Sequence, residues 1–218
     1  MTILIRMICL AVGYVFGLFQ TGYLYGRKQG VDIRKEGSGN SGATNSLRVF
    51  GIKAGVIVFA GDMLKTLIPC LIARAIFRES APDMAYLYML YTGFGAVLGH
   101  NYPFYMNFKG GKGISCTAGL ALAVNWKVAL CLFVLFLLIV GVTKFVSLAS
   151  LVAVTGVLIT MIVMATSGAL GLGHAAVIEF IILGFLWAAL AFFRHRANIG
   201  RLIAGNENKT YLFGKKKD

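Results

Sequence analysis

Long apolar stretches, separated by short polar or glycine-rich segments, run along the whole chain. A membrane-spanning helix needs about 20 apolar residues, and on that basis the sequence predicts spans at residues 3–25, 53–72, 84–98, 145–166 and 174–193. The stretch 114–142 is too long for one straight span, and Asn125, Trp126 and Lys127 interrupt it near the middle. It fits either a single tilted helix or two short helices, 114–124 and 128–142, that turn at Asn125.

The distribution of basic residues favours the two short helices. With the turn at Asn125 the chain has seven spans, its N-terminus outside and its C-terminus in the cytoplasm, and the outside holds only Arg6, Arg74, Arg78 and Lys127. Membrane proteins show this bias of positive charge toward the cytoplasm. A single tilted helix would place the loop of Lys109 opposite the basic tail, Lys215 to Lys217 included. The sequence therefore predicts an all-α, polytopic membrane protein with seven transmembrane helices, some of them short.

Composition supports a membrane protein. The 218 residues are 58% hydrophobic and 13% charged, with a mean hydropathy of +0.79. No polar stretch is long enough for a second domain, so residues 1–218 are expected to form a single membrane domain. The net charge of +13 would suggest a nucleic-acid partner in a soluble protein. Here topology and anionic head groups or substrates explain it better, so membrane lipids are expected partners and nucleic acid is not. The four cysteines lack metal-ligand spacing, and neither a metal nor a cofactor is expected.

The segment 99–113 contains the first candidate chemistry. It ends in Lys109, Gly110, Gly111, Lys112 and Gly113. Glycines let backbone amides converge on an anion, and the lysines add positive charge. If the next segment is a helix, its free N–H groups point back at the same spot. The Walker pattern of nucleotide-binding loops is absent. The segment thus predicts a phosphate or carboxylate site, in a protected cavity if the short helix 114–124 begins inside the membrane.

Two further polar segments have similar character. Residues 38–45, followed by Arg48, combine glycines with short hydrogen-bonding side chains, so they either wrap an anion or form a turn in which Thr44 or Asn45 caps a helix. In the tail, His195 and Asn198 are three residues apart, and neither residue type is needed for a basic flank. Inside the spans, Asp62 and Lys65 lie one helical turn apart and are expected to pair as a support of the cavity wall. The sequence assigns no role to Glu179.

Three segments in this order match a known pattern. They are Ser38 to Asn45 with Arg48; Gly99-His100 with Pro103, Phe108 and Lys109 to Gly113; and His195-Arg196, Asn198-Ile199, Arg201-Leu202, Gly205 and Glu207. On these motifs, spread over nearly the whole chain, the protein resembles the bacterial membrane glycerol-3-phosphate acyltransferases that use acyl phosphate as donor.

The resemblance implies a reaction and a location. Acyl phosphate and sn-glycerol 3-phosphate would give 1-acyl-sn-glycerol 3-phosphate (lysophosphatidic acid) and phosphate, the first acylation step of phospholipid synthesis. The family has seven spans and its motifs face the cytoplasm, which places the protein in the bacterial cytoplasmic membrane. The oligomeric state stays open, and a monomer is compatible with the sequence.

The resemblance also implies roles, residue by residue. The catalytic residues would be Ser38, Arg48, His195 and Asn198. The substrate-binding residues would be Asn40, Ser41, Asn45, Lys109, Gly110, Gly111, Lys112, Gly113 and Ser147. Glu207 would be structural. Before Ser147 the family more often has Arg-Tyr than Lys144-Phe145, so an arginine fork would be replaced by a point charge.

Simple chemistry agrees with this assignment. An acyl phosphate is an activated mixed anhydride, so the enzyme needs mainly positioning and charge neutralisation. The base that removes the hydroxyl proton is either His195 or the donor's own phosphate, and we slightly favour the phosphate with His195 as orienter. The acyl chain would lie in a hydrophobic groove open to the bilayer.

A phosphate or organophosphate transporter is the competing function, because two anion-binding loops would suit one. However, we find no internal repeat of the kind on which many transporter folds are built, and a transporter gives His195 and Asn198 no role. A structural lipid-binding protein is a more distant alternative.

Overall fold

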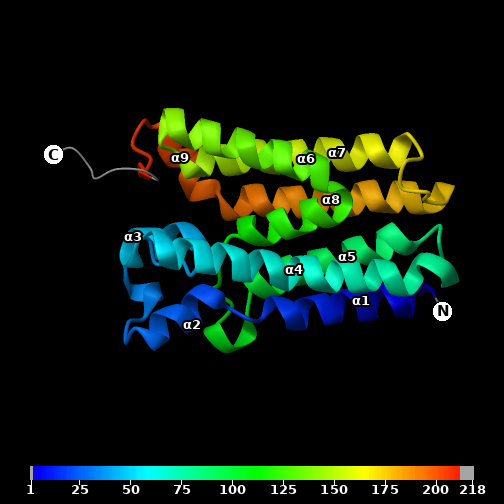
Figure 1. The fold of residues 1–218 in the computed structure, drawn as a ribbon, viewed down its shortest axis with the longest axis horizontal. Helices are drawn as coiled ribbons and strands as arrows, with labels where there is room; N and C mark the ends of the chain where they lie inside the picture. Colours follow the sequence, from blue (N-terminus) through cyan, green and yellow to red (C-terminus); the bar gives the residue numbers. More distant parts are fainter. Residues whose placement is uncertain (1, 212–218) are drawn as a thin grey trace.

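The computed structural model describes residues 2–211, and every regular element in that range is helical (Figure 1). The α-helices are α1 Thr2–Gly17, α2 Thr21–Lys28, α3 Ala43–Phe50, α4 Ile52–Ser80, α5 Ala85–Asn101, α6 Ile114–Thr143, α7 Val146–Thr166, α8 His174–Arg194 and α9 Arg196–Ile203. Two short 3₁₀ turns occur at Ile33–Lys35 and Phe104–Met106. The lysines at 215 to 217, which the charge argument includes, lie outside the described residues.

Within residues 2–211, five helical runs are long and apolar enough to cross a membrane: Ile3–Lys28, Ile52–Ser80, Ile114–Thr143, Val146–Thr166 and His174–Arg194. Exposed apolar side chains cover the outer faces of α1, α4 and the second part of α6, as expected for helices that face lipid. Helix α5 is the most enclosed, with most of its residues buried, and it packs against both α1 and α4. The chain is therefore a multi-pass membrane protein.

Two predicted spans are present but differ from the prediction in detail. The span expected at 3–25 breaks at Leu18 to Gln20, where the Gln20 amide donates to the carbonyls of Gly17 (3.2 Å) and His100 (3.1 Å). The span expected to end at residue 72 continues to Ser80. This longer helix includes Arg74. The guanidinium of Arg74 donates to the Ala123 carbonyl and lies over the Tyr86 ring, and these contacts accommodate its charge.

Helix α6 is two helical limbs that meet at Asn125, whose backbone is non-helical (φ −156°, ψ 103°). The Asn125 side-chain oxygen accepts the amides of Lys127 and Val128 at 3.1 and 3.2 Å and so caps the second limb. The first limb runs along α4 toward Arg74. The second limb returns along the bundle (Figure 1), and its Phe133 stacks on Phe59 in the first half of α4. The predicted turn is confirmed; the number of crossings and the orientation stay predictions.

Close packing of α1 on α5 depends on four glycines. Gly13 and Gly17 of α1 and Gly95 and Gly99 of α5 each face the partner helix, and a Cβ on any of them would lie 1.9–2.2 Å from a backbone oxygen there. The Gly-x-x-x-Gly spacing on both helices is a known contact pattern of membrane helices. It brings the break after α1 against the C-terminal end of α5, where the glycine-rich loop begins. A separate apolar core fills the space between α5, α6, α7 and α8.

The end of the bundle away from this loop has its own polar contact. Arg6 of α1 holds Glu179 of α8 with two bonds, Nε to Oε1 at 2.5 Å and Nη2 to Oε2 at 2.6 Å. The Tyr91 hydroxyl donates to the same carboxylate at 2.7 Å. Glu179, which the sequence left without a role, thus joins three helices.

Replacing Glu179 by alanine is expected to lower stability by about 3 kcal/mol, or roughly 6–12 °C in Tm, because Arg6 is left without its counter-ion among apolar helices. Thermal unfolding in detergent measures this. The double variant Arg6→Met, Glu179→Leu removes both charges and should lose much less. An equal loss in both variants would show that packing, not the ion pair, matters here.

Candidate functional site

The three motifs come together at one end of the helices, the end at which α3 and α9 lie (left in Figure 1). A direct hydrogen bond joins the second and third motifs, from Lys112 to Asn198. The first motif is linked to the second through Gln20, and its Arg48 bonds Thr210, just beyond the third motif.

The glycine-rich loop and the tail are linked by a chain of polar side chains. The ammonium of Lys112 donates to the side-chain oxygen of Asn198. The Asn198 amide donates to Glu207 at 2.8 Å, and Arg201 donates to the other Glu207 oxygen at 2.9 Å. Burial lowers the pKa of Lys112 to about 8, although the charge of Glu207 opposes this. Lys112 is therefore a positive charge fixed at the meeting point of two motifs.

The expectation that the amides of Gly110 and Gly111 face an anion is wrong. They donate to the carbonyls of Asn101 and His100, both at 3.1 Å, and their own carbonyls accept from Arg194 at 3.1 and 2.8 Å. Glycine is required for space, because a Cβ on Gly111 would lie 1.9 Å from the His100 ring nitrogen Nε2.

The rest of the loop stays available to a ligand. Gly113 has φ +82°, a conformation that favours glycine, and it is the residue from which α6 starts. The first N–H groups of α6 have no helical acceptor. The Lys109 side chain is exposed.

The first motif shapes its own loop. The Asn45 oxygen accepts the Ser38 amide at 2.9 Å, and the Asn45 amide donates to the Glu36 carbonyl at 2.9 Å. Asn40 accepts the Gly42 amide at 2.9 Å. Asn45 is thus occupied by backbone groups, while the Ser38 side chain is exposed. The alternative that Thr44 or Asn45 caps a helix is wrong, because Gly42 is the residue before α3.

Two contacts tie the first motif to the others. Ser41 donates to Gln20 at 3.3 Å, and Gln20 in turn donates to the His100 carbonyl. On the other side, Arg48 donates to the Thr210 hydroxyl at 2.6 Å, and the Thr210 amide donates to the Lys144 carbonyl at 2.8 Å.

The connection between α6 and α7 contains Lys144 and is followed by the buried hydroxyl of Ser147 in the first turn of α7. Lys144 itself is left-handed (φ +64°), and its ammonium donates to the Gly141 carbonyl. Three residues later, Ser147 is buried, and its hydroxyl has no partner among residues 2–211. Ser147 therefore retains its hydrogen-bonding capacity for a ligand.

His195 lies directly after α8 and is almost fully buried, at 3% exposed. Its Nδ1 lies 2.8 Å from the Ala191 carbonyl, so Nδ1 has the proton and Nε2 is an acceptor. Burial lowers the pKa of His195 to about 4. The imidazole is therefore neutral near pH 7 and able to accept a hydrogen bond.

Sequence reasoning missed Gln20, Arg194 and Thr210 as parts of this end of the molecule. Arg194 donates to both glycine carbonyls and lies over the Tyr102 ring at 5.1 Å. Gln20 gave one signal: a lone amide side chain near the end of an apolar stretch. Thr210 gave none.

Comparison with known proteins gives a consistent result. The chain matches the glycerol-3-phosphate acyltransferase family over residues 7–205. It is 40% identical over 198 residues to a glycerol-3-phosphate acyltransferase of Shouchella clausii (strain KSM-K16), covering 90% of this chain and 92% of that relative. A relative with the same name from Clostridioides difficile (strain 630) is 38% identical over 223 residues, which cover both chains fully.

Two solved structures are also similar. Both are crystal structures of PlsY (YgiH), an integral membrane glycerol 3-phosphate acyltransferase, 35% identical to this chain. The glycerol 3-phosphate form has a TM-score of 0.81 over 94% of this chain and 96% of that one. The lysophosphatidic acid form has 0.79 over 95% and 96%. The chain therefore belongs to the glycerol-3-phosphate acyltransferase family and is a multi-pass membrane acyltransferase.

Proposed function

We propose that this enzyme transfers an acyl group from acyl phosphate to sn-glycerol 3-phosphate, giving lysophosphatidic acid and phosphate. The observation that supports it most is the hydrogen-bonded chain from Lys112 through Asn198 to Glu207, which places a cation from one motif beside a polar group from another. The relative PlsY was crystallised in forms named for glycerol 3-phosphate and lysophosphatidic acid, the acceptor and product of this reaction.

The proposed enzyme is a single domain over residues 1–218 in the bacterial cytoplasmic membrane. It has seven spans, its site faces the cytoplasm, and acylation of glycerol 3-phosphate is its step in phospholipid synthesis. The turn at Asn125 supports this topology, because it keeps the basic loops on one side.

The two anionic groups have separate proposed positions. The acceptor phosphate lies at Lys112 and the start of α6, from Gly113 onward, with Lys109 nearby and Gly110 and Gly111 as the loop's support. The donor phosphate lies at Ser38, Arg48 and Ser147. Asn40, Ser41 and Asn45 hold the first loop in shape, and Glu207 is structural because it fixes Asn198 and Arg201.

In the proposed step the acceptor hydroxyl oxygen bonds to the acyl carbon, the bond from that carbon to the phosphate oxygen breaks, and phosphate leaves with the electron pair. The hydroxyl proton ends on the released phosphate. With a pKa of about 4, His195 is a weak base near pH 7, which supports the donor phosphate as the group that accepts the proton. The neutral imidazole can still orient the hydroxyl by accepting a hydrogen bond at Nε2. Asn198, fixed by Lys112 and Glu207, orients the reacting groups.

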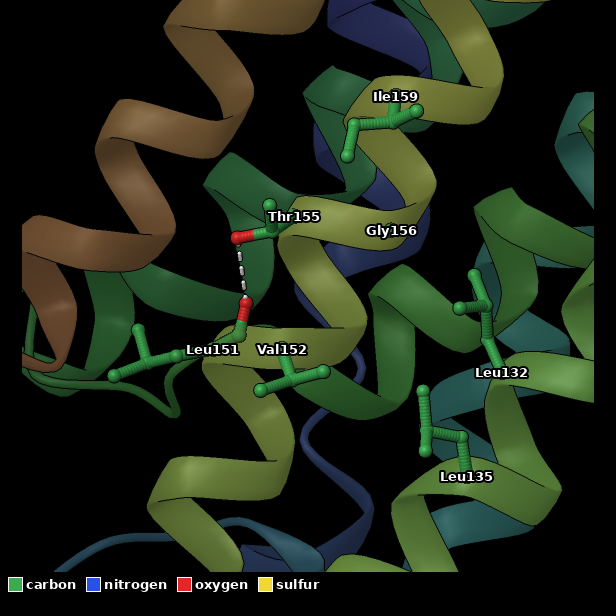
Figure 2. A pocket seen from close by; sticks show the side chains of 7 residues that line it. All are labelled: Leu132, Leu135, Leu151, Val152, Thr155, Gly156 and Ile159. Carbon is green, nitrogen blue, oxygen red and sulfur yellow. Dashed lines mark hydrogen bonds between the residues drawn. The ribbon is translucent and has the colours of Figure 1, made fainter.

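An apolar groove between α6 and α7 is the proposed place of the acyl chain (Figure 2). It has a volume of about 340 Å³ and is lined by Leu132, Leu135, Leu151, Val152, Thr155, Gly156 and Ile159. The only hydroxyl, on Thr155, donates to the Leu151 carbonyl at 3.0 Å, so the wall offers no free polar group. Leu151 lies one helical turn after Ser147 on α7, about 6 Å along the helix axis, so the groove begins close to the proposed donor-phosphate position.

Filling the groove should shorten the accepted chain. Val152→Trp is expected to lower kcat/KM for a palmitoyl donor by about tenfold and for a decanoyl donor by less than about threefold, because only the longer chain needs the far end. The matched control is Val163→Trp on the lipid-exposed face of α7, which should change neither. Equal loss with both donors would remove the groove from the donor site.

The pH dependence follows from Lys112, whose pKa is lowered to about 8 by burial. Below pH 8 the ammonium is charged, and as the pH rises through 8 the charge is lost. KM for glycerol 3-phosphate should therefore rise about tenfold between pH 7 and 9. Lys112→Arg stays charged over this range and should give a flat profile; a parallel rise in both would place the titration elsewhere.

Reconstitution into liposomes separates this function from transport. With a palmitoyl phosphate donor and radiolabelled glycerol 3-phosphate, the enzyme should move label into extractable lipid. Label that accumulates as free glycerol 3-phosphate inside the vesicles, with none in lipid, would overturn the proposal in favour of a transporter.

A further inference from the structure

A buried cluster of charged and polar groups lies behind the glycine-rich loop, and the proposed reaction uses none of it. Asp62 and Lys65 of α4 form an ion pair at 2.8 Å, and Thr21 donates to the same Asp62 oxygen at 3.0 Å. His100, at the end of α5, is 2% exposed and lies next to this pair. Burying such charges inside a membrane protein costs free energy, which indicates that the Asp62–Lys65 pair has a structural or functional role.

Lys65 has three partners. Its ammonium lies 2.8 Å from Asp62 Oδ1, 2.6 Å from the Phe19 carbonyl and 2.9 Å from His100 Nδ1. An ammonium has three N–H donors, and each is used. Because Lys65 donates to Nδ1, the neutral imidazole of His100 has its proton on Nε2.

His100 in turn supports the loop. Its Nε2 is the atom that a Cβ on Gly111 would meet at 1.9 Å, and its carbonyl accepts the Gly111 amide at 3.1 Å. Ring and carbonyl thus contact the residue directly before Lys112. A tilt of the ring would displace Gly111 and, with it, the Lys112 backbone.

We propose that Lys65, held by Asp62, is a positioning residue for acceptor binding: it fixes the tautomer and orientation of His100, and through Gly111 the position of Lys112. This deepens the proposed function and rests on its placement of the acceptor phosphate at Lys112. The residue touches no reacting atom, so its effect should fall on acceptor affinity rather than on the donor.

The test compares two ways of neutralising the pair. Lys65→Met with Asp62→Leu removes both charges and the donor to His100; replacing both partners of a buried pair is tolerated better than replacing one. Lys65→Gln with Asp62→Asn is also uncharged but keeps an amide donor at position 65. Glycerol 3-phosphate affinity is measured by thermal protection without any donor, and KM for both substrates by turnover.

The apolar pair is expected to bind glycerol 3-phosphate at least tenfold more weakly, with the donor KM within about twofold. The amide pair should recover most of the affinity. The matched control is Arg6→Met with Glu179→Leu, which removes another ion pair far from the site. Glu179 lies about 22 Å along α8 from Arg194, the residue that bonds the glycine-rich loop, at 1.5 Å per residue. The acceptor affinity of this control variant should be unchanged.

Unchanged affinity in the apolar pair, or an equal loss in the control pair, would overturn the proposal. If the apolar pair does not elute as a monodisperse protein, the variant Thr21→Val is used instead, because it removes only the hydrogen bond from Thr21 to Asp62. About threefold weaker binding of glycerol 3-phosphate is expected, and unchanged binding would contradict the proposal. Because thermal protection needs no donor, a wild-type protein that fails to turn over acyl phosphate counts against the proposed function alone.

Discussion

Replacing His195 by alanine is expected to lower kcat by about 10²-fold in a protein that still folds, because the acceptor hydroxyl loses the group that orients it. The imidazole is neutral, buried and locked by its Nδ1 bond to the Ala191 carbonyl, so Nε2 is the only ring atom left to orient the acceptor hydroxyl. Alanine removes that acceptor while leaving Lys112 and Arg48 in place. KM for glycerol 3-phosphate should therefore change much less than kcat.

Steady-state kinetics on detergent-purified protein gives both constants, and thermal unfolding checks the fold. The matched control is His174→Ala at the opposite end of α8, which should keep the kcat of the parent enzyme. Near-normal turnover of His195→Ala would discard any role for His195 in the reaction.

Lys112→Ala should raise KM for glycerol 3-phosphate by about 10- to 100-fold and lower kcat by less. A charge-assisted hydrogen bond contributes about 1.5–3 kcal/mol, and each 1.4 kcal/mol is a factor of ten. The substitution also removes the partner of the Asn198 oxygen, which accounts for a part of the effect on kcat.

Lys109→Ala is the comparison for Lys112→Ala, because Lys109 is in the same loop but its side chain is exposed. Its KM should rise by no more than about threefold, as expected for a screened surface charge. If KM is unchanged in Lys112→Ala, this lysine does not hold the acceptor.

The features that could be predicted from sequence depend on short stretches of chain or on the overall distribution of basic residues. Apolar length predicts the helices, the polar break at Asn125 predicts the turn, and the charge bias chooses the turn over a straight helix. The motif residues also lie at one end of the bundle, as the loops that contain them suggest. The spacing of Gly13 with Gly17 and of Gly95 with Gly99 is also a sequence signal for the close contact of α1 with α5.

The features that could not be predicted depend on which helices become neighbours. Arg6 and Glu179 are 173 residues apart, and nothing local in either apolar stretch indicates their pairing. The glycine amides were expected to bind a ligand because the sequence does not show that the carbonyls of His100 and Asn101 lie within reach of them. Similarly, the sequence does not show that Gln20, in the break at Leu18 to Gln20, lies within reach of the carbonyls at the end of α5.

Acceptor-dependent product formation by the purified protein tests the central claim most directly. Palmitoyl phosphate and palmitoyl-CoA are supplied in parallel, with and without glycerol 3-phosphate, while phosphate release and lysophosphatidic acid are both quantified. Equal amounts of phosphate and lysophosphatidic acid, formed only from palmitoyl phosphate and only with glycerol 3-phosphate, are the predicted result. Formation of lysophosphatidic acid from palmitoyl-CoA alone would contradict the donor assignment, and no product from either donor would contradict the proposed reaction as a whole.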